Sequence, residues 1–230
     1  MKIKSHPFIL PFVKKEQVAK DTFAFYFGRS KENWDFLPGQ YIQLRLPIEN
    51  PDTRGTMRYF SISSSPLDKQ YLRVITKVIQ SSFKMTLASL KKGDEVSFFG
   101  PNGDFYFMQN EPSHIFLAGG IGMTPFISMI QYASSKNLQN KITLFVSFSN
   151  PEEMIFFDQL SKISKEHKNI NVIYTTGRIT AELIKKNIPD ITKPLYYITG
   201  PPAMVDATVK MVGKMGIPQD RILEEHFSGY

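Results

Sequence analysis

Cysteine is absent from this 230-residue sequence, and only four histidines are present. The lack of thiols excludes disulfides, cysteine nucleophiles and Cys-ligated zinc or iron–sulfur centres. The histidines are scattered without HxH or HxxxH spacing, so no metal site is expected. No apolar run reaches the roughly 18–20 residues that span a bilayer, and residues 1–7 lack the apolar core of a signal peptide. The sequence therefore predicts a cytoplasmic protein without a membrane span.

Positive charge is in excess, at +7 overall, and it is concentrated in one half. Residues 1–110 carry 16 Lys and Arg against 10 Asp and Glu, whereas residues 111–230 carry 12 against 11. Such a surface is either merely solvated or docks an anionic partner. The basic residues are dispersed and no helix-turn-helix, RNP or zinc-finger pattern is present, which argues against nucleic acid. An acidic protein or a phosphorylated ligand fits a dispersed excess better.

The first half has the pattern of a small antiparallel β-barrel. Short aromatic or β-branched runs at residues 23–27, 41–46, 71–78 and 95–99 are separated by turns rich in Gly, Pro, Asn and Asp. One helical stretch, Ser82 to Leu90, interrupts them. Several short strands at this spacing are typical of a barrel.

The second half alternates strands with helices. Strands are predicted at residues 114–118, 141–147, 171–175, 195–198 and 221–225, and helices at 124–134, 152–167, 180–186 and 201–215. This alternation indicates an α/β domain, with helices on both faces of a parallel sheet and ligands at the carboxyl ends of the strands. We therefore predict two domains, a β-barrel over residues 1–110 and an α/β domain over residues 111–230.

Two glycine turns follow strands of the second half. The first, Gly119 to Pro125 (GGIGMTP), joins an apolar strand to a helix, whose free N–H groups and partial positive charge suit a pyrophosphate. It is neither a GxGxxG fingerprint nor a Walker loop. The second, Thr199 to Met204 (TGPPAM), follows a later strand in the same way. Each alone fits an ordinary strand-to-helix turn, but two in one parallel sheet predict a nucleotide site.

Three other segments carry groups that suit a planar, phosphorylated ligand. Arg58, Phe60 and Ser61 combine a guanidinium that can pair with phosphate, a ring that can stack and a hydroxyl. Ser81 is placed to cap a helix whose first N–H groups suit a second phosphate. The last six residues, Glu225 to Tyr230 (EHFSGY), bring a carboxylate and two aromatic rings after the last strand. Taken singly, these segments also fit an ordinary strand, helix cap and packed tail.

The order of these motifs resembles the ferredoxin–NADP(+) reductase superfamily. The order is R-x-F-S, a helix start, GPNGDF at residues 100–105, GGxGxTP, GPPAM and a terminal E-x-F. The resemblance extends from Phe8 to Tyr230 and is closest to stand-alone bacterial reductases without a fused iron–sulfur domain. It implies an FAD-binding barrel (FR-type), an NAD(P)-binding domain and hydride transfer between NAD(P)H and FAD.

The resemblance also implies roles for individual residues. Arg58 matches the arginine that holds the flavin diphosphate, Phe60 the aromatic that stacks on the isoalloxazine, and Ser61 the hydroxyl that hydrogen-bonds flavin N5. Glu225 and Phe227 match the carboxylate and aromatic beside the flavin, where Phe227 would gate the nicotinamide. The implied catalytic set is Ser61, Thr199, Glu225 and Phe227. Further flavin contacts are expected from Tyr59, Ile75, Thr76, Lys77, Ser82, Phe83, Lys84, Met85 and Thr86. Contacts with the nicotinamide dinucleotide are expected from Gly119, Gly120, Gly122, Met123, Thr124, Pro125, Ser149, Gly200, Pro201, Met204 and Phe227.

The sequence departs from the usual family pattern at three places. Ser81 and Lys84 stand in the flavin phosphate helix where G-x-x-S/T is usual, so FAD is expected with FMN as the alternative. Thr199 replaces a frequent Cys, which affects the rate of hydride transfer and not its occurrence. The arginine that often follows the second strand of the nicotinamide domain in NADP-specific members is missing. Candidate substitutes for it are Ser149, Asn150 and Arg178, and the choice between NADPH and NADH stays open.

The sequence thus predicts an NAD(P)H-dependent flavoprotein reductase that passes electrons to a separate carrier, because no Cys is available for a built-in iron–sulfur centre. Acidic carriers such as ferredoxin or flavodoxin suit the basic first half. Alternatives are the reductase component of an oxygenase, a free flavin reductase and, from another class, a non-catalytic nucleotide-binding regulatory module. We expect a monomer, with no nucleic acid partner.

Overall fold

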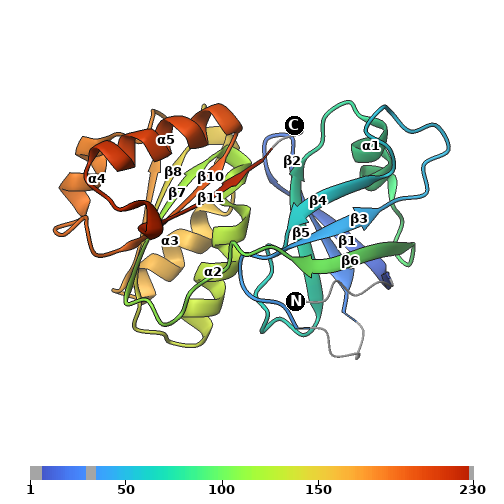
Figure 1. The fold of residues 1–230 in the computed structure, drawn as a ribbon. Helices are drawn as coiled ribbons and strands as arrows, with labels where there is room; N and C mark the ends of the chain where they lie inside the picture. The colour runs from blue at the N-terminus through green and yellow to red at the C-terminus, as the bar shows by residue number, and fades with distance from the viewer. Residues whose placement is uncertain (1–6, 30–34, 228–230) are drawn as a thin grey trace.

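The computed structural model describes residues 7–29 and 35–227. Figure 1 shows two units side by side, an antiparallel sheet with one helix and a parallel sheet with four, joined by the segment after β6. This is the predicted fold class. Ser228, Gly229 and Tyr230 of the terminal motif, and residues 1–6, lie outside the described residues. The boundary predicted between residues 110 and 111 falls in the joining segment and stays a prediction.

The first unit is a six-stranded antiparallel sheet in the order β4-β3-β6-β1-β2-β5. The sheet curls so that its edge strands, β4 and β5, approach each other, and just beyond β4 the Ser63 N–H donates to the Arg73 carbonyl of β5 (2.9 Å). Apolar side chains fill the interior, including Leu10, Phe25 and Phe98. The strands are β1 (Phe8–Ala19), β2 (Thr22–Gly28), β3 (Tyr41–Arg45), β4 (Met57–Ser61), β5 (Tyr71–Lys77) and β6 (Glu95–Asn102).

The helix of the barrel, α1 (Ser82–Ser89), begins where the sequence predicts. The Ser81 hydroxyl accepts the Lys84 N–H (3.2 Å), which is the N-cap bond expected of serine at this position. Phe83 and Leu87 anchor the helix in the barrel core. Its first turn is therefore packed against β4, where the Phe83 ring lies 6.0 Å from the Phe60 ring.

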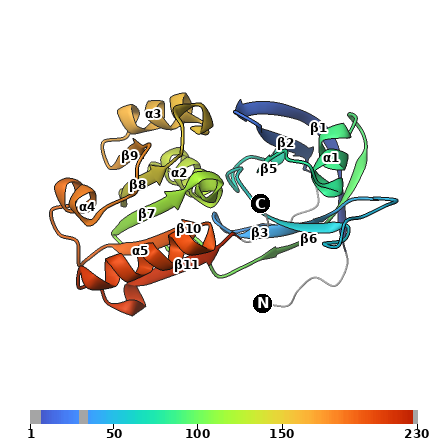
Figure 2. The same cartoon turned by 90° about the horizontal axis from the view of Figure 1, so that it is seen from above.

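The second unit is a five-stranded parallel sheet in the order β11-β10-β7-β8-β9. One face packs on α2 (Thr124–Ser135) and α3 (Phe157–Glu166), and the other on α4 (Ala181–Asn187) and α5 (Pro202–Lys214), as Figure 2 shows. The strands are β7 (Ser113–Gly119), β8 (Lys141–Ser147), β9 (Ile170–Thr175), β10 (Leu195–Gly200) and β11 (Ile222–His226). Short 3-10 turns lie at η1 (Gly120–Met123), η2 (Pro151–Glu153) and η3 (Gln219–Arg221).

One predicted helix is wrong at its beginning. The sequence predicts helix from residue 152, but residues 151–153 form only η2 and α3 begins at Phe157. The barrel holds this segment: the Lys20 N–H donates to the Glu152 carbonyl (2.9 Å), and Lys77 pairs with Glu153 (3.0 Å). Phe156 then takes a left-handed conformation with a φ of 51°. Tertiary contacts therefore override the local helical pattern.

His114, on β7, is a buried titratable group to which the sequence assigns no catalytic or binding role. Its ring lies 4.5 Å from the Phe107 ring and is 1% exposed. Neither ring nitrogen forms a hydrogen bond of normal geometry with any described residue. Burial lowers the pKa of His114 from 6.5 to about 4, so the ring is neutral at pH 7.

This burial makes the stability of the protein sensitive to acid. Between pH 6.5 and 4 His114 binds a proton in the unfolded chain but not in the folded protein. The free energy of unfolding therefore falls as the pH falls, and it levels off below pH 4. Between pH 7.5 and 4.5 the free energy of unfolding of wild type should fall further than that of His114→Phe, by about 2–3 kcal/mol. Urea unfolding at the two pH values measures this difference. His167→Phe, at the less enclosed end of α3, is the control, and equal losses in both variants would contradict the assignment.

No helix among the described residues is long and apolar enough to cross a membrane.

Candidate active site

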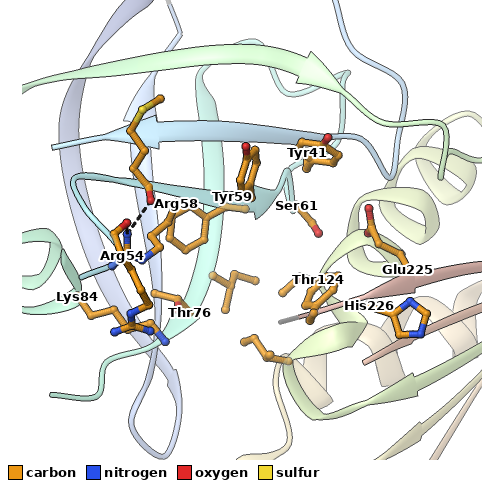
Figure 3. A pocket seen from close by; sticks show the side chains of 15 residues that line it. Tyr41, Arg54, Arg58, Tyr59, Ser61, Thr76, Lys84, Thr124, Glu225 and His226 are labelled. Atoms are coloured by element: carbon orange, nitrogen blue, oxygen red, sulfur yellow. Dashed lines mark hydrogen bonds between the residues drawn. The ribbon is translucent and has the colours of Figure 1, made fainter. Parts of the chain in front are cut away.

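A cavity of about 510 Å³ lies where the barrel meets the carboxyl edge of the parallel sheet (Figure 3). This size is in the range of small-molecule sites. Its barrel wall comes from β3, β4, β5 and α1, and its other wall from η1, α2 and the end of β11. The lining residues are Tyr41, Arg54, Met57, Arg58, Tyr59, Phe60, Ser61, Ile75, Thr76, Lys84, Ile121, Thr124, Glu225, His226 and Phe227.

The barrel end of the cavity is strongly cationic. Arg58 Nη1 donates to the carbonyls of Arg54 and Met57 (both 2.7 Å), and Nη2 donates to an Asp52 carboxylate oxygen (2.9 Å). Its guanidinium lies over the Phe83 ring at 5.0 Å, so it is held rigidly. Arg54 and Lys84 line the same end (Figure 3). Three positive groups converging on one end suit a bound anion.

Lys84 shows how concentrated this charge is. Its side chain is buried, and burial, followed by the charges of Arg54 and Arg58, lowers its pKa to about 8. Asp52, the nearby carboxylate, is tied to the first turn of α1, because its N–H donates to the Ser82 hydroxyl (3.0 Å). The loop before β4 and the start of α1 therefore share one polar network.

The lowered pKa of Lys84 predicts pH-dependent binding of a phosphorylated flavin. A diphosphate stabilises the charged amine of Lys84, so above pH 8 binding of the flavin must be accompanied by uptake of a proton. The logarithm of the Kd should therefore rise with pH, with a slope approaching one. Flavin titration of the stripped protein between pH 7 and 9.5 measures this rise. Lys84→Met should bind more weakly and lose the slope, whereas Lys91→Met, at an exposed position just after α1, should keep it. A slope in Lys84→Met equal to that of wild type would contradict the prediction.

Aromatic rings line the barrel wall beside the cationic end. Phe60 is 9% exposed and packs against Phe83 with ring centroids 6.0 Å apart. Tyr59 is 67% exposed and meets Tyr41 edge-on at 5.6 Å. The Ser61 hydroxyl lies between these rings and the second wall (Figure 3). Tyr41 was missed by sequence reasoning, although it pairs with Ser61 across β3 and β4.

The two predicted glycine turns touch each other. A Cβ at Gly122 would lie 2.7 Å from both the Gly200 Cα and the Thr199 carbonyl oxygen. Gly120 has a φ of +53°, in the left-handed region that favours glycine. A Cβ at Gly119 would lie 3.3 Å from Pro201 and Met204 atoms. The structure therefore brings both turns together at one edge of the sheet, as their pattern predicted.

Two buried polar atoms, one on the second wall and one on the strand next to it, have no partner among the described residues. Thr199 Oγ1 and Glu225 Oε2 are buried and form no hydrogen bond with any described residue. The two residues pair in register across β10 and β11, and Glu225 lines the cavity whereas Thr199, predicted as catalytic, lies outside the lining set. Burial raises the pKa of Glu225 to about 7. Buried groups of this kind are normally satisfied, so a bound molecule with polar groups fits this wall.

Phe227 and the remaining predicted residues take different positions. The Phe227 N–H donates to the Gly200 carbonyl (2.9 Å), and its ring lines the cavity. Thr124, Ile75 and Thr76 also line it. Lys77 instead pairs with Glu153, and Met85 is exposed on α1. Among the described residues, those predicted to contact a cofactor that lie outside the lining set are Lys77, Ser82, Phe83, Met85, Thr86, Gly119, Gly120, Gly122, Met123, Pro125, Ser149, Gly200, Pro201 and Met204.

The loops beyond β8 and β9 hold the candidate nucleotide-specificity residues. Ser149, Asn150 and Arg178 are all exposed there. The Ser147 hydroxyl donates to the Gly177 carbonyl (2.8 Å) and joins the two loops. The sequence analysis missed Arg54 and Met57, and it assigned no individual contact to Ile121 or His226, which lie inside two of its motifs. Arg54 and Met57 flank Arg58 closely in sequence, which is the signal that points to them.

A cationic, aromatic barrel that faces a parallel sheet with paired glycine turns defines a two-domain protein for a flavin and a nicotinamide dinucleotide. Residues 10–107 match the oxidoreductase FAD-binding domain, and residues 116–210 match the oxidoreductase NAD-binding domain. The chain belongs to the ferredoxin–NADP(+) reductase superfamily, which its motifs had indicated. FAD and NAD(P) are therefore its cofactor and nucleotide classes.

Curated relatives and solved structures agree with this family. Flavohemoprotein A of Dictyostelium discoideum is 29% identical over 233 residues, which cover 93% of this chain and 58% of that protein. NADH-cytochrome b5 reductase 1 of Aspergillus terreus is 30% identical over 203 residues, covering 80% of this chain and 68% of that protein. The ferredoxin-NADP+ reductase structure from Plasmodium falciparum has a TM-score of 0.80 at 19% identity, covering 98% of this chain and 100% of that chain. The chain thus spans little more than half the length of Flavohemoprotein A.

Proposed function

We propose that this chain is an NAD(P)H-dependent flavoprotein reductase that passes electrons to a separate carrier protein. The observation that carries the proposal is the cavity shared by a cationic barrel end and a wall that includes Glu225, whose buried Oε2 has no partner among the described residues. In this proposal residues 1–110 hold FAD and residues 111–230 hold the nicotinamide nucleotide. Bound FAD supplies the redox chemistry, because it accepts a hydride and releases electrons singly.

The barrel wall fits FAD in its charges and rings. Arg58, Arg54 and Lys84 provide the positive charge that a diphosphate requires, and the start of α1 adds backbone N–H groups. Phe60 and Tyr59 offer ring faces for a planar group. Ser61 presents a hydroxyl that donates and accepts a hydrogen bond. These residues bind and orient the cofactor.

The second wall has a different task. The Gly119–Pro125 and Gly200–Met204 turns lie against each other. Each turn leads into a helix, whose first backbone N–H groups are available to the phosphates of the nucleotide. Phe227 occupies the cavity between them and the barrel, and it must move aside when the nicotinamide enters. Burial raises the pKa of Glu225 to about 7, so this carboxyl can hold or release a proton near neutral pH. Thr199 adds its hydroxyl beside Glu225.

The electron acceptor is proposed as an acidic one-electron carrier such as ferredoxin or flavodoxin. Residues 1–110 carry the excess of positive charge, which favours encounter with an acidic protein. Tyr59 and Met85 are exposed on the same unit and offer apolar contact area. The relatives named for haem and for cytochrome b5 support one-electron acceptors as a class. An oxygenase component as the partner, or free flavin, remains the alternative.

Spectroscopy of the purified protein tests the proposal. We expect a yellow protein whose flavin absorbance bleaches within seconds of adding NADH or NADPH without oxygen, and the ratio of the two rates gives nucleotide preference. Oxidised ferredoxin, flavodoxin and free FMN are then added separately. Reoxidation by a carrier protein supports the proposal, whereas release of reduced flavin with no carrier reduction favours a free flavin reductase. A protein that stays colourless after FAD reconstitution overturns it.

A further inference from the structure

Directly behind the cavity, polar contacts join the barrel to α2. After Ser61 the chain continues through Ile62 to Ser65, all buried. The Ser128 hydroxyl of α2 donates to the Ser64 carbonyl (2.7 Å), and both residues are fully or nearly fully buried. One turn further along α2, Gln131 Oε1 accepts from Arg73 Nη2 (3.1 Å). The helix is therefore bound to the barrel at two successive turns.

Arg73 is the centre of these contacts. It is 7% exposed, and its Nε donates to the Ser63 hydroxyl (3.1 Å) while its N–H donates to the Ser64 hydroxyl (3.1 Å). Its guanidinium also lies 4.7 Å from the Phe156 ring, in the segment before α3. A buried guanidinium must be hydrogen-bonded, so its partners are held in fixed positions.

These contacts lie close in sequence to residues of both cavity walls. Ser61 lies three residues before Ser64, and Thr124 lies four residues before Ser128. Ser61 and Thr124 both line the cavity, one on each wall (Figure 3). Each wall is thus connected to the same buried junction, one through about one turn of helix and the other through a short extended segment.

We infer that Ser128 and Gln131, with their partners Ser64 and Arg73, form a latch that sets the spacing between the flavin wall and the nicotinamide wall. The inference rests on the proposed function. Hydride transfer depends steeply on the spacing of donor and acceptor, and a misplacement of about 1 Å can cost about 100-fold in rate. Ser128 and Gln131 are positioning residues, since neither lines the cavity among the described residues.

Two substitutions open the latch without touching the cavity. Ser128→Ala removes the hydroxyl that donates to the buried Ser64 carbonyl, and Gln131→Leu removes one of the two acceptors of Arg73 Nη2 and leaves the Ser63 carbonyl (2.5 Å) as the other. Gln131→Glu keeps an acceptor for Arg73 and should behave like wild type. Ser134→Ala is the matched control, because Ser134 lies on the same helix but donates only to the Gln131 carbonyl within α2 (3.2 Å).

Two readouts test the latch, one of them independent of catalysis. In the flavin-free double variant Ser128→Ala/Gln131→Leu, we expect the amides of residues 61–65 to exchange with deuterium at least fivefold faster than in Ser134→Ala. In the flavin-loaded double variant, we expect reduction by saturating nucleotide to be at least tenfold slower at unchanged flavin content. The long-wavelength absorbance of the nucleotide–flavin complex should also weaken, since it reports the contact of the two rings.

The outcomes separate the latch from the proposed function. The latch is overturned if the amides of residues 61–65 exchange in the double variant as slowly as in Ser134→Ala. It is also overturned if the rate of flavin reduction is within twofold of that of Ser134→Ala. If the wild type itself is not reduced by either nucleotide, the proposed function fails, while the exchange comparison still decides whether the contacts hold the two units together. If the double variant does not fold, Gln131→Leu alone, at a partly exposed position, is judged by the same exchange criterion and by a rate at least threefold slower than that of Gln131→Glu.

Discussion

Replacing Arg58 by alanine should lower FAD affinity by about 100-fold or more. The guanidinium is held by the Arg54 and Met57 carbonyls and by Asp52, so it is preorganised for a phosphate. Charge-assisted hydrogen bonds contribute about 1.5–3 kcal/mol each, and about 1.4 kcal/mol corresponds to a tenfold change in affinity. Loss of Arg58 also leaves Asp52 with Arg54 as its remaining partner, which places an under-compensated carboxylate beside the phosphates.

Titration of the stripped protein with FAD measures this effect. Arg45→Ala is the matched control, because Arg45 is an exposed arginine of the neighbouring strand whose guanidinium lies over Phe99 (4.9 Å), outside the cavity lining among the described residues. The double variant Asp52→Asn/Arg58→Ala should recover part of the loss if the carboxylate contributes. Stoichiometric FAD in Arg58→Ala as purified, at the affinity of Arg45→Ala, would refute the phosphate role of Arg58.

Gly122→Ala should weaken nicotinamide nucleotide binding by at least tenfold and destabilise the fold by about 2–3 kcal/mol. The new Cβ would lie 2.7 Å from the Gly200 Cα and 2.8 Å from the Gly200 nitrogen. Backbone atoms cannot rotate away as a side chain can, so the two glycine turns must separate. For a chain of this size that loss lowers the melting temperature by about 5–10 °C.

A second glycine provides the comparison for this variant. Gly213 lies within α5, and a Cβ there would have no heavy atom within 4 Å. Gly213→Ala should therefore raise stability by about 0.5–1 kcal/mol, because alanine favours a helix. Nucleotide titration and thermal unfolding of the two variants give both quantities. If Gly122→Ala has the same nucleotide Kd and the same melting temperature as Gly213→Ala, the close contact of the two turns is unimportant.

Most of the fold can be predicted from the sequence because its local signals agree with its tertiary structure. β8 begins and ends where the pattern predicts, since its apolar residues are bounded by polar ones on both sides. β1 was missed because residues Lys14 to Gln17 are exposed and mostly charged, although all four pair with β2. The delayed start of α3 depends on contacts of residues 152 and 153 with Lys20 and Lys77. Such contacts between distant residues leave no local signal.

The candidate site divides in the same way. Arg58, Phe60, Ser61 and Phe227 were identified from motifs, and the structure places all four around one cavity. Their assigned roles remain predictions. The orphaned Glu225 and Thr199 atoms could not be predicted, because whether a polar atom is paired depends on three-dimensional packing. The same is true of Asp52, whose contact with Arg58 requires the loop before β4 to fold back.

In the described chain, the segment between β6 and β7 is the only passage from one sheet to the other. Everything on the barrel wall is therefore encoded before it and everything on the opposite wall after it. Under the proposed function, substitutions in residues 1–110 act first on FAD binding and substitutions in residues 111–230 act first on nucleotide binding, and the contacts of Ser128 and Gln131 with Ser64 and Arg73 are where the two halves depend on each other.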